Sequence, residues 1–425
     1  MKLASYWHDT AAAFQGGKDG PVEGHADVAV VGGGFTGLSA ALALAKTGAK
    51  VVLVEAGRVG GEASGRNGGH CNNGLSADFR AASEKLGLPL AKSLYRAFDA
   101  AVDTVERIIG DERIDCDFKR TGKIKLAAKP EHFDKLARSY ELMSREVDPD
   151  TDLVPRSAIK SEIGSDAFHG GLVYRKSANM HMGKFVGGLA GGAARHGAAI
   201  YENAPVTMLR RLGGRKHEIV TGRGSFSADQ VLLATGTSVK GPFSHFRRRI
   251  VPVGSFIIVT EPLSENVLGD LMPTRRTATT TKNIGHYFRI TPDNRLLFGG
   301  RARFAMSSPT SDAKSGKILQ RGMLSLFPQL HGTRIDYCWG GLVDMTADRL
   351  PRAGEHEGLL YSMGYSGHGT QMSVHMGQVM AEVMNGRPDA NPFRDLDWPA
   401  IPGHFGPPWF LPFVGAYYRL QDWLH

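Results

Sequence analysis

The stretch Asp27–Ala56, with the sequence DVAVVGGGFTGLSAALALAKTGAKVVLVEA, predicts the fold of this chain. An apolar run over residues 28–31 ends in the glycine turn 32–37. A helical pattern of small residues follows, and a second apolar run over residues 51–54 ends at Glu55. We predict a strand, a tight turn, a helix and a second strand, which is the unit that binds a dinucleotide in α/β folds.

Each glycine of the turn has a separate physical role in such a unit. Gly32 allows the sharp turn, Gly34 lets the backbone approach a pyrophosphate, and Gly37 lets the helix pack close to the strand. The helix N-terminus then offers unpaired N–H groups and a positive dipole end. Glu55 is placed to accept hydrogen bonds from a ribose. The alternative, a glycine-rich turn in an ordinary α/β core, explains neither the second strand nor the acid.

Three further stretches extend this interpretation along the chain. Residues 57–74 are too rich in glycine for a helix or strand core, and we expect their backbone to lie flat against the rest of the dinucleotide. The apolar segment 230–236 predicts a central parallel strand buried on both faces. Residues 358–370 form a third glycine-rich region, and the helix predicted over 371–384 would aim its N-terminus at negative charge.

The remainder of the chain has a different pattern. Amphipathic helices are predicted from residue 75 to about residue 103, and residues 1–24 read as an extended or loosely packed segment. After residue 253 the pattern indicates antiparallel strands, with residues 285–290 pairing with residues 296–299 across a Pro-Asp-Asn-Arg turn. We therefore expect a second, antiparallel unit beside the dinucleotide unit.

Bulk properties exclude several classes of protein. The formal net charge is +9, but the basic runs are short and no nucleic-acid-binding motif accompanies them, so we predict no nucleic-acid partner. No uninterrupted apolar run is long enough for a transmembrane segment, and no secretory signal pattern precedes residue 25. Three scattered cysteines, Cys71, Cys116 and Cys338, argue against a disulfide framework. We expect a cytoplasmic protein, and no metal site.

The glycine-rich stretches together resemble the D-amino-acid-oxidase-like family of flavoproteins, which includes glycine and sarcosine oxidases. The resemblance is strongest to the gamma-glutamylputrescine oxidase type. It covers nearly the whole chain, and five motifs carry it: the glycine turn, residues 63–69 (ASGRNGG), 287–300 (YFR to LFGG), 349–351 (RLP) and 367–369 (GHG). The implied fold class is α/β, a Rossmann-like FAD-binding domain with an interleaved antiparallel-sheet α+β substrate domain. In that division residues 25–80, 165–245 and 335–388 form the FAD-binding domain, residues 81–164 and 246–334 form the substrate or cap domain, and residues 389–425 pack on the body.

FAD is the dinucleotide that this resemblance implies. The glycine turn would hold the pyrophosphate, and Glu55 the ribose. The loop from Ser64 to Gly69 would follow the ribityl chain and flavin, Val206 would lie by the adenine, and Thr235 and Gly236 would lie at the diphosphate. The 367–370 turn would place N–H groups near the flavin N1–C2=O edge. The complete set of implied cofactor residues is Gly32, Gly34, Phe35, Thr36, Gly37, Glu55, Ala56, Ser64, Gly65, Arg66, Asn67, Gly68, Gly69, His70, Val206, Thr235, Gly236, Gly367, His368, Gly369 and Thr370.

The family reaction is oxidation of an amine C–N bond. A hydride passes from the carbon that bears the nitrogen to flavin N5, the imine hydrolyses, and O2 reoxidises the flavin to give hydrogen peroxide. The resemblance thus implies a small-molecule amine substrate, either an amino acid or a gamma-glutamylated polyamine-like compound, and leaves the oligomeric state open. A dehydrogenase that passes electrons to a quinone or carrier protein is the alternative. A nonenzymatic flavoprotein or an NAD-sensing module is a third reading.

Candidate catalytic residues are Tyr287, Arg289 and His368. Strand alternation places Tyr287 and Arg289 on one face, which in the family faces the substrate, and His286 on the other. Simple packing of Tyr287 in a sheet is the competing interpretation, as is an ordinary loop role for His368. Three further points stay open: covalent attachment of FAD at His70 or Cys71, carboxylate binding by Arg301 and Arg303, and a membrane-surface helix among the C-terminal aromatic residues.

Overall fold

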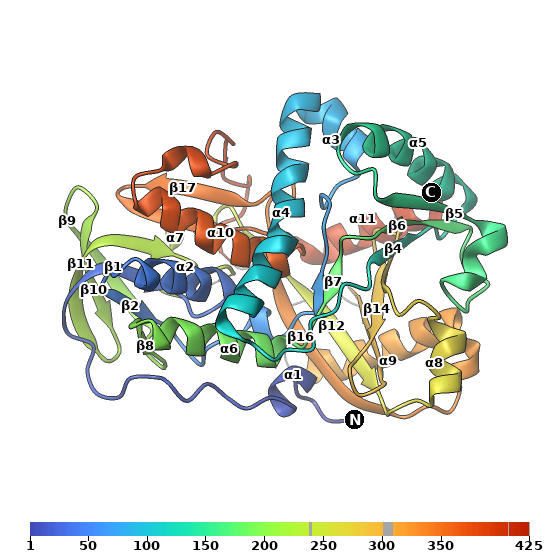
Figure 1. Cartoon of the computed structure of the whole chain (residues 1–425), viewed down its shortest axis with the longest axis horizontal. Coiled ribbons are helices and arrows are strands. Elements are labelled where there is room, and N and C mark those ends of the chain that lie inside the picture. The colour runs from blue at the N-terminus through green and yellow to red at the C-terminus, as the bar shows by residue number, and fades with distance from the viewer. Residues whose placement is uncertain (238–239, 301–308, 407, 425) are drawn as a thin grey trace.

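The computed structural model describes residues 1–237, 240–300, 309–406 and 408–424. Two eight-stranded sheets dominate it, and Figure 1 shows them in the two halves of an elongated molecule. Arg301 and Arg303, which the sequence offers as carboxylate ligands, lie outside the described residues.

The first sheet contains the dinucleotide-type unit. Strand β1 (Gly24–Val31) leads through the glycine turn into α2 (Phe35–Lys46) and then into β2 (Val51–Val54). Strand β1 pairs in parallel with β2 on one side and with β11 (Gly224–Leu233) on the other. The predicted central parallel strand over residues 230–236 is confirmed for residues 230–233, the end of β11, and residues 234–236 follow the strand. The full order is β17 (Arg352–His356), β18 (Leu359–Met363), β11, β1, β2 and β8 (Ala199–Tyr201), and β10 (Lys216–Thr221) and β9 (Val206–Gly213) extend from β11 as antiparallel strands.

Helices of small residues cover this sheet because only small side chains let them approach one another closely. Helix α2 packs against α6 (Met182–Arg195) and α10 (Gly369–Met384), and α4 (Leu88–Glu112) lies beside α10 (Figure 1). A Cβ atom on Gly377 of α10 would lie 2.5 Å from the carbonyl oxygen of Thr36, so no larger residue fits. The side chain of Ser39 donates to the carbonyl oxygen of Val374 at 2.6 Å. The N-terminal ends of α2 and α10 are therefore held in a fixed relation.

The second sheet is antiparallel apart from one pair. Its order is β16 (Ile335–Met345), β12 (Val251–Thr260), β15 (Leu296–Gly300), β14 (His286–Ile290), β13 (Thr277–Thr280), β4 (Lys123–Leu126), β6 (Gly170–Tyr174) and β5 (Thr151–Pro155), and only β13 and β4 run parallel. The predicted hairpin of residues 285–299 is confirmed as β14 and β15. Helices α8 (Glu265–Leu271) and α9 (Pro309–Leu326) cover the outer face through one apolar cluster. The inner face is turned toward the first sheet and its loops.

The N-terminal segment differs from the expectation. Residues 6–9 form a short helix, α1 (Tyr6–Asp9), and Trp7 is fully buried rather than loosely packed. The indole N–H of Trp7 donates to the carbonyl oxygen of Asn67 at 2.6 Å, which satisfies the polar edge of an otherwise apolar ring. The expectation of a loose segment was therefore wrong at its start. The many glycine and small residues of this segment suggested loose packing, whereas its aromatic residues Tyr6 and Trp7 are buried.

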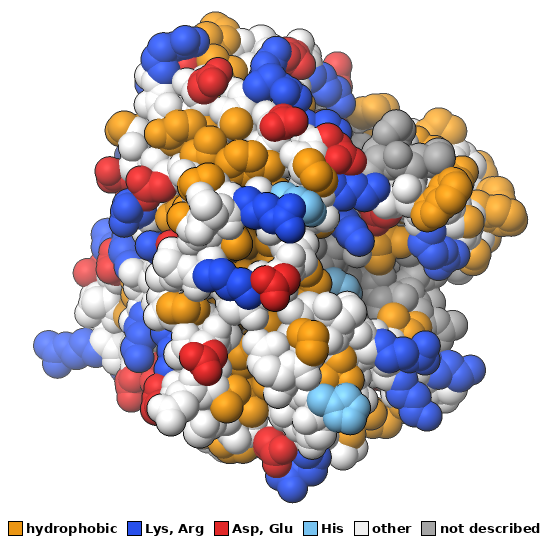
Figure 2. Space-filling view, turned by 90° about the vertical axis from the view of Figure 1, so that its right-hand side faces the viewer, with side chains coloured by type: hydrophobic (Ala, Val, Ile, Leu, Met, Phe, Trp, Pro, Cys, Tyr) orange, Lys and Arg blue, Asp and Glu red, His pale blue; other side chains and the backbone are white. Residues whose placement is uncertain are grey.

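The C-terminal helix α11 (Leu411–Leu424) lies against the second sheet. The carboxylate of Asp422 accepts hydrogen bonds from the backbone N–H groups of Asn283 and Ile284, both at 2.8 Å. Its outward face leaves Phe413, Tyr417 and Trp423 exposed. Among the described residues no helix has both the length and the apolar character that crossing a bilayer requires. Figure 2 shows hydrophobic side chains at the right edge of the molecule, and mixed basic and acidic side chains over the centre of that face.

The remaining elements connect these layers. They are α3 (Phe79–Leu86), α5 (Pro130–Glu146), α7 (Ser244–Arg247), the short pair β3 (His70–Cys71) and β7 (Ala178–Asn179), and the 3-10 turns η1 (Ala63–Gly65), η2 (Arg156–Ser161), η3 (Pro328–Leu330) and η4 (Pro388–Ala390).

Candidate active site

The glycine turn between β1 and α2 leaves no room for side chains. Gly32 has a φ of +114°, and a Cβ atom there would overlap the carbonyl oxygen of Ala234 at the end of β11. A Cβ atom on Gly37 would overlap the carbonyl oxygen of Gly32. Gly34 precedes the helix as its N-cap and provides no side chain to satisfy the first N–H groups. The turn is therefore built of backbone and lies at a helix N-terminus, whose first N–H groups have no partner within the helix.

Glu55 follows β2 and lies directly beside this turn. Its carboxylate accepts hydrogen bonds from the backbone N–H of Gly33 at 2.6 Å and of Gly57 at 2.8 Å. Burial raises the pKa of Glu55, and the two backbone donors act in the opposite direction. The structure thus brings Glu55 to the glycine turn, as a ribose-binding acid requires, with Ala56 next to it in the chain.

The loop from Ser64 to His70 runs from the glycine turn toward the second sheet. Ser64 begins it by accepting a hydrogen bond from the N–H of Phe35 at 3.0 Å. Arg66 then donates to the carbonyl oxygen of Gly340 on β16 at 2.8 Å. The side-chain oxygen of Asn67 accepts from the N–H of Gly69 at 2.8 Å. The loop therefore links the two sheets.

The start of α10 reaches the same loop from the other side. Thr370 donates from its hydroxyl to the side-chain oxygen of Asn67 at 3.4 Å, and the amide of Gln371 donates to the carbonyl oxygen of Asn72 at 2.5 Å. His368 is the N-cap of α10, and Gly367 before it has a φ of +92°. The predicted 367–370 turn and the 64–70 loop are thus in contact. Two helix N-termini, of α2 and α10, face this region with their positive dipole ends.

Tyr287 meets the loop from the inner face of the second sheet. A Cβ atom on Gly68 would lie 2.8 Å from the Tyr287 ring, and the ring of His70 stands edge-on to it at a centroid distance of 5.5 Å. The Tyr287 hydroxyl lies 3.1 Å from that of Ser255 on β12. His286 points to the other face, where its ring lies against Gly322 of α9. The predicted alternation along this strand is confirmed.

Arg289 lies on the same face but is fully buried. Its guanidinium donates to the carbonyl oxygens of Gly69 at 2.6 Å and Met180 at 2.9 Å, and it lies over the Trp7 ring. Burial lowers the pKa of Arg289 to about 10. Burial, followed by the nearby charge of Arg289, lowers the pKa of His70 to about 3, so this imidazole is neutral at physiological pH. Arg289 fixes the loop backbone at the point where it passes Tyr287.

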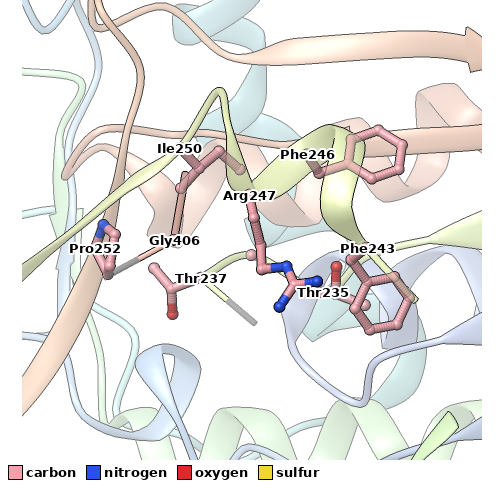
Figure 3. Close-up of a pocket in the computed structure, with 9 residues that line it drawn as sticks. Thr235, Thr237, Phe243, Phe246, Arg247, Ile250, Pro252 and Gly406 are labelled. Carbon is pink, nitrogen blue, oxygen red and sulfur yellow. The ribbon is translucent and has the colours of Figure 1, made fainter. Parts of the chain in front are cut away.

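The other predicted residues lie at the far end of this region. Val206 begins β9 and is buried in the cluster beneath the first sheet. Thr235 and Gly236 follow β11 and line a cavity of ≈ 10 Å³, which holds no more than one water molecule. Figure 3 shows the guanidinium group of Arg247 directed toward Thr235 in this cavity. A cation therefore lies near the residues expected at the diphosphate.

Two features of the site were not predicted. Asp344 near the end of β16 accepts a hydrogen bond from the N–H of Gly364 at 2.6 Å, and burial raises its pKa to about 6. The sequence pattern that could have indicated Asp344 is an acid near the end of the otherwise apolar run 339–345. The second feature is Lys123 and Lys125 on β4, where they alternate with apolar residues. This alternation places both lysines on the inner face of the sheet.

Comparison with known proteins agrees with this geometry. A model of the DAO family, described as FAD dependent oxidoreductase, matches residues 27–383. The chain belongs to this family. It is 32% identical to the gamma-glutamylputrescine oxidoreductase of Escherichia coli over 402 residues, 93% of this chain and 92% of the relative. It is 33% identical to the probable oxidoreductase OrdL of Haemophilus influenzae over 386 residues, 89% of this chain and 88% of the relative.

Solved structures show the same fold. The structure of glycine oxidase from Geobacillus kaustophilus has a TM-score of 0.71 at 22% identity and covers 90% of this chain and 98% of its own. The predicted α/β fold class, with a Rossmann-like unit, is confirmed. The predicted family is confirmed as well, together with FAD as its cofactor.

The residues present fit FAD. A pyrophosphate requires close approach of backbone at a helix N-terminus, and the overlaps at Gly32 and Gly37 show that these two positions admit only glycine. The loop from Ser64 to Gly69 continues from that turn to Tyr287. This DAO family member is an FAD-dependent oxidoreductase, and the residue-by-residue contacts to FAD stay a prediction.

Proposed function

We propose that the chain oxidises the C–N bond of a primary or secondary amine, either an amino acid or a gamma-glutamylated polyamine-like compound. Bound FAD supplies the acceptor for two electrons. A hydride leaves the carbon that bears the nitrogen, water hydrolyses the imine, and O2 is finally reduced to hydrogen peroxide. The relatives named for gamma-glutamylputrescine and glycine support an amine donor.

The contact between Tyr287 and Gly68 is the observation that carries this proposal. The ring of Tyr287, on the sheet expected to face the substrate, lies against the 64–70 loop, which is predicted to follow the flavin. A substrate held against Tyr287 would thus lie where its C–H bond can approach the reacting end of the cofactor, and such positioning is the protein's main contribution to hydride transfer.

The polar groups around Tyr287 suit an amine that must lose its proton before oxidation. His70 is neutral at physiological pH, so it adds no positive charge beside the amine. Arg289 keeps its guanidinium on backbone carbonyl groups of the loop, and we assign it a positioning role. His368, at the start of α10, would place backbone N–H groups where negative charge develops during reduction.

The domain division and the location of the protein remain proposals. All strands of the first sheet lie within the proposed FAD-binding part, residues 25–80, 165–245 and 335–388, apart from the first residue of β1. Most strands of the second sheet lie within the proposed substrate part, residues 81–164 and 246–334. Strands β6 and β16 belong to the second sheet although they fall in the FAD-binding ranges. Hydrogen bonds from Asn283 and Ile284 to Asp422 support packing of the 389–425 segment on the substrate part. The cytoplasmic location stays a prediction.

An anaerobic amine screen tests the function. Amines, polyamine derivatives and N-methyl amino acids are mixed with the purified holoenzyme, and the flavin absorbance near 450 nm is followed. Bleaching by at least one amine is expected, and a protein that no amine bleaches would not be an amine oxidoreductase. Peroxide release measured beside dye reduction then separates the two acceptors. Turnover without peroxide release would mean that the electron acceptor is a quinone or a carrier protein and not O2.

A further inference from the structure

The two faces of the second sheet differ in how they are filled. On the outer face, Ile124, Ala278 and Phe288 are fully buried under α8 and α9. Their neighbours on the inner face keep accessible surface. Lys125, Thr279 and Tyr287 are each only half-buried although they lie in central strands. The inner face therefore keeps a row of partly accessible side chains, and Tyr287 lies at the end of this row beside Gly68 of the 64–70 loop.

These three residues form one row across the sheet. Lys125 of β4 pairs with Thr279 of β13, and Thr279 pairs with Tyr287 of β14. Because adjacent strands are about 4.8 Å apart, the backbones of Lys125 and Tyr287 are roughly 10 Å apart. The row thus runs from Tyr287, where we expect the amine, to the side chain of Lys125 two strands away.

The two lysines of β4 differ in their partners. Lys123 donates to the carbonyl oxygen of Asn73, and its ammonium lies 4.1 Å from the centre of the Tyr174 ring. The ammonium of Lys125, two residues on and on the same face, has no hydrogen bond or ion pair with any other described residue. Desolvation lowers the pKa of Lys125, and the charge of Arg349 lowers it further, while Asp78 opposes both. An ammonium in this position lacks the anion that would stabilise it.

The charged groups near Lys125 leave an excess of positive charge. The position of Arg349 is fixed because its carbonyl oxygen accepts a hydrogen bond from Ser76 at 2.8 Å, and its guanidinium donates to the hydroxyl of Tyr418 at 3.4 Å. Within the part of the chain that the structure describes, Asp78 is the acid whose charge acts on Lys125, and its carboxylate already caps α3 by accepting from the N–H of Ala81 at 3.1 Å. The positive charges of Lys125 and Arg349 are therefore opposed by one carboxylate, that of Asp78, which already accepts a hydrogen bond from the backbone.

We propose that Lys125, with Arg349 beside it, binds a substrate carboxylate that is several bonds away from the reacting amine. The proposal rests on the proposed amine oxidation and narrows its substrate class. In an α-amino acid the amine and carboxylate are on one carbon, too close to span the distance between Tyr287 and Lys125. An amine whose chain ends in a carboxylate spans much of the roughly 10 Å between the two strands. Such a substrate neutralises the ammonium of Lys125 through a charge-assisted hydrogen bond, which is stronger than a hydrogen bond between neutral groups.

Three amines and one non-reacting acid test this inference on the holoenzyme. The amines are 6-aminohexanoate, hexylamine, which lacks the carboxylate, and glycine, in which the two groups share one carbon. Hexanoate has no amine, so its binding is read from the change in the flavin spectrum without turnover. The variants are Lys125→Met, Lys125→Arg and, as a matched control on the surface of α5, Lys135→Met. Flavin content and thermal unfolding show which variants are folded.

The inference predicts a selective effect. Lys125→Met should raise KM for 6-aminohexanoate by ten- to a hundredfold and weaken hexanoate binding to the same degree, with kcat and the KM of hexylamine changed less than threefold. Lys125→Arg should recover most of the affinity, and Lys135→Met should match the native enzyme. Equal effects on both amines, no effect of Lys125→Met, or no hexanoate binding by the native enzyme would overturn the inference.

The two proposals fail in different ways. If no amine bleaches the flavin but hexanoate binding depends on Lys125, the amine reaction is wrong and the carboxylate site stands. If the amines are oxidised and the carboxylate makes no difference, the amine reaction stands and the Lys125 site is wrong. If Lys125→Met does not fold, the Lys125→Arg variant and the hexanoate titration of the native enzyme decide.

Discussion

The backbone N–H of Phe35, the first residue of α2, donates a hydrogen bond to the side-chain oxygen of Ser64 at 3.0 Å. Ser64 belongs to the next loop of the chain, yet it satisfies one of the open donors at this helix N-terminus, as a capping residue would. This bond fixes the distance between the dinucleotide turn and the loop that leads to Tyr287. The start of the 64–70 loop is thus tied to the dinucleotide turn by the side chain of Ser64.

Replacing Ser64 by Ala should weaken FAD binding. The substitution removes a hydrogen bond of about 1 kcal/mol and frees the start of the loop, so we expect the Kd for FAD to rise roughly fivefold. Fluorescence titration of the apoprotein with FAD measures this. Ser325→Ala is the matched control, because Ser325 lies on the exposed side of α9 and bonds only to the carbonyl oxygen of Gly322. Equal FAD affinity in the two variants would contradict the role of Ser64.

Gly37→Ala and Gly110→Ala should have opposite effects on stability. Both glycines lie inside helices, but a Cβ atom on Gly37 overlaps the carbonyl oxygen of Gly32, whereas nothing lies within 4 Å of one on Gly110. We expect Gly37→Ala to reduce the free energy of unfolding by about 2 kcal/mol or more, because backbone must move. Gly110→Ala should raise it by up to about 1 kcal/mol through helix propensity. Urea unfolding of both variants decides, and similar values would disprove the close approach at Gly37.

The dinucleotide unit could be predicted from the sequence because its requirements are local. Gly32 has a positive φ and a Cβ atom on Gly37 would overlap the carbonyl oxygen of Gly32, so both requirements act within a few residues, and the apolar runs on either side of them fix the strands. The same holds for the alternation that separates Tyr287 from His286. Each of these features depends on the period of a strand or on the absence of a side chain, and both are visible in the sequence.

What the sequence did not predict depends on contacts between distant segments. Trp7 can be buried since the carbonyl oxygen of Asn67, sixty residues later, accepts a hydrogen bond from its indole N–H. Asp344 acquires its raised pKa from burial among groups of a different loop. The relation of Lys125 to Tyr287 depends on the pairing of β4 with β13 and of β13 with β14, which puts both residues in one row of the sheet. Strand order across two sheets is not encoded in local periodicity.

Tyr287→Leu should impair catalysis without loss of flavin. The ring lies over Gly299 and against Gly68, and both glycines would lose their neighbour. A substrate held less firmly misses the alignment that hydride transfer needs, so we expect kcat/KM to fall about tenfold or more. Flavin content and the visible spectrum should stay unchanged. Tyr417→Leu on the exposed face of α11 is the control. A native kcat/KM in Tyr287→Leu would support the alternative in which this residue only packs in the sheet.

The buried ammonium of Lys123 should make stability rise with pH. Burial, and then the charge of Lys125, lowers the pKa of Lys123 from 10.5 to about 7. Between these two values the unfolded chain binds a proton at this lysine that the folded protein does not bind. Raising the pH through this range therefore favours the folded state, and the contribution is lost as the pH falls. Lys123→Met removes the ionisation.

The measurement is the free energy of urea unfolding at pH 7 and pH 9 for the native protein and for Lys123→Met. From pH 7 to pH 9 the native value should rise by about 2 kcal/mol relative to that of the variant, which follows from the shift of Lys123 at about 1.4 kcal/mol per pH unit. Lys119→Met, which alters an exposed lysine, should follow the native curve. A difference between native protein and Lys123→Met that does not change with pH would mean that Lys123 keeps an ordinary pKa. Its ammonium would then be well stabilised by the carbonyl oxygen of Asn73 and the ring of Tyr174.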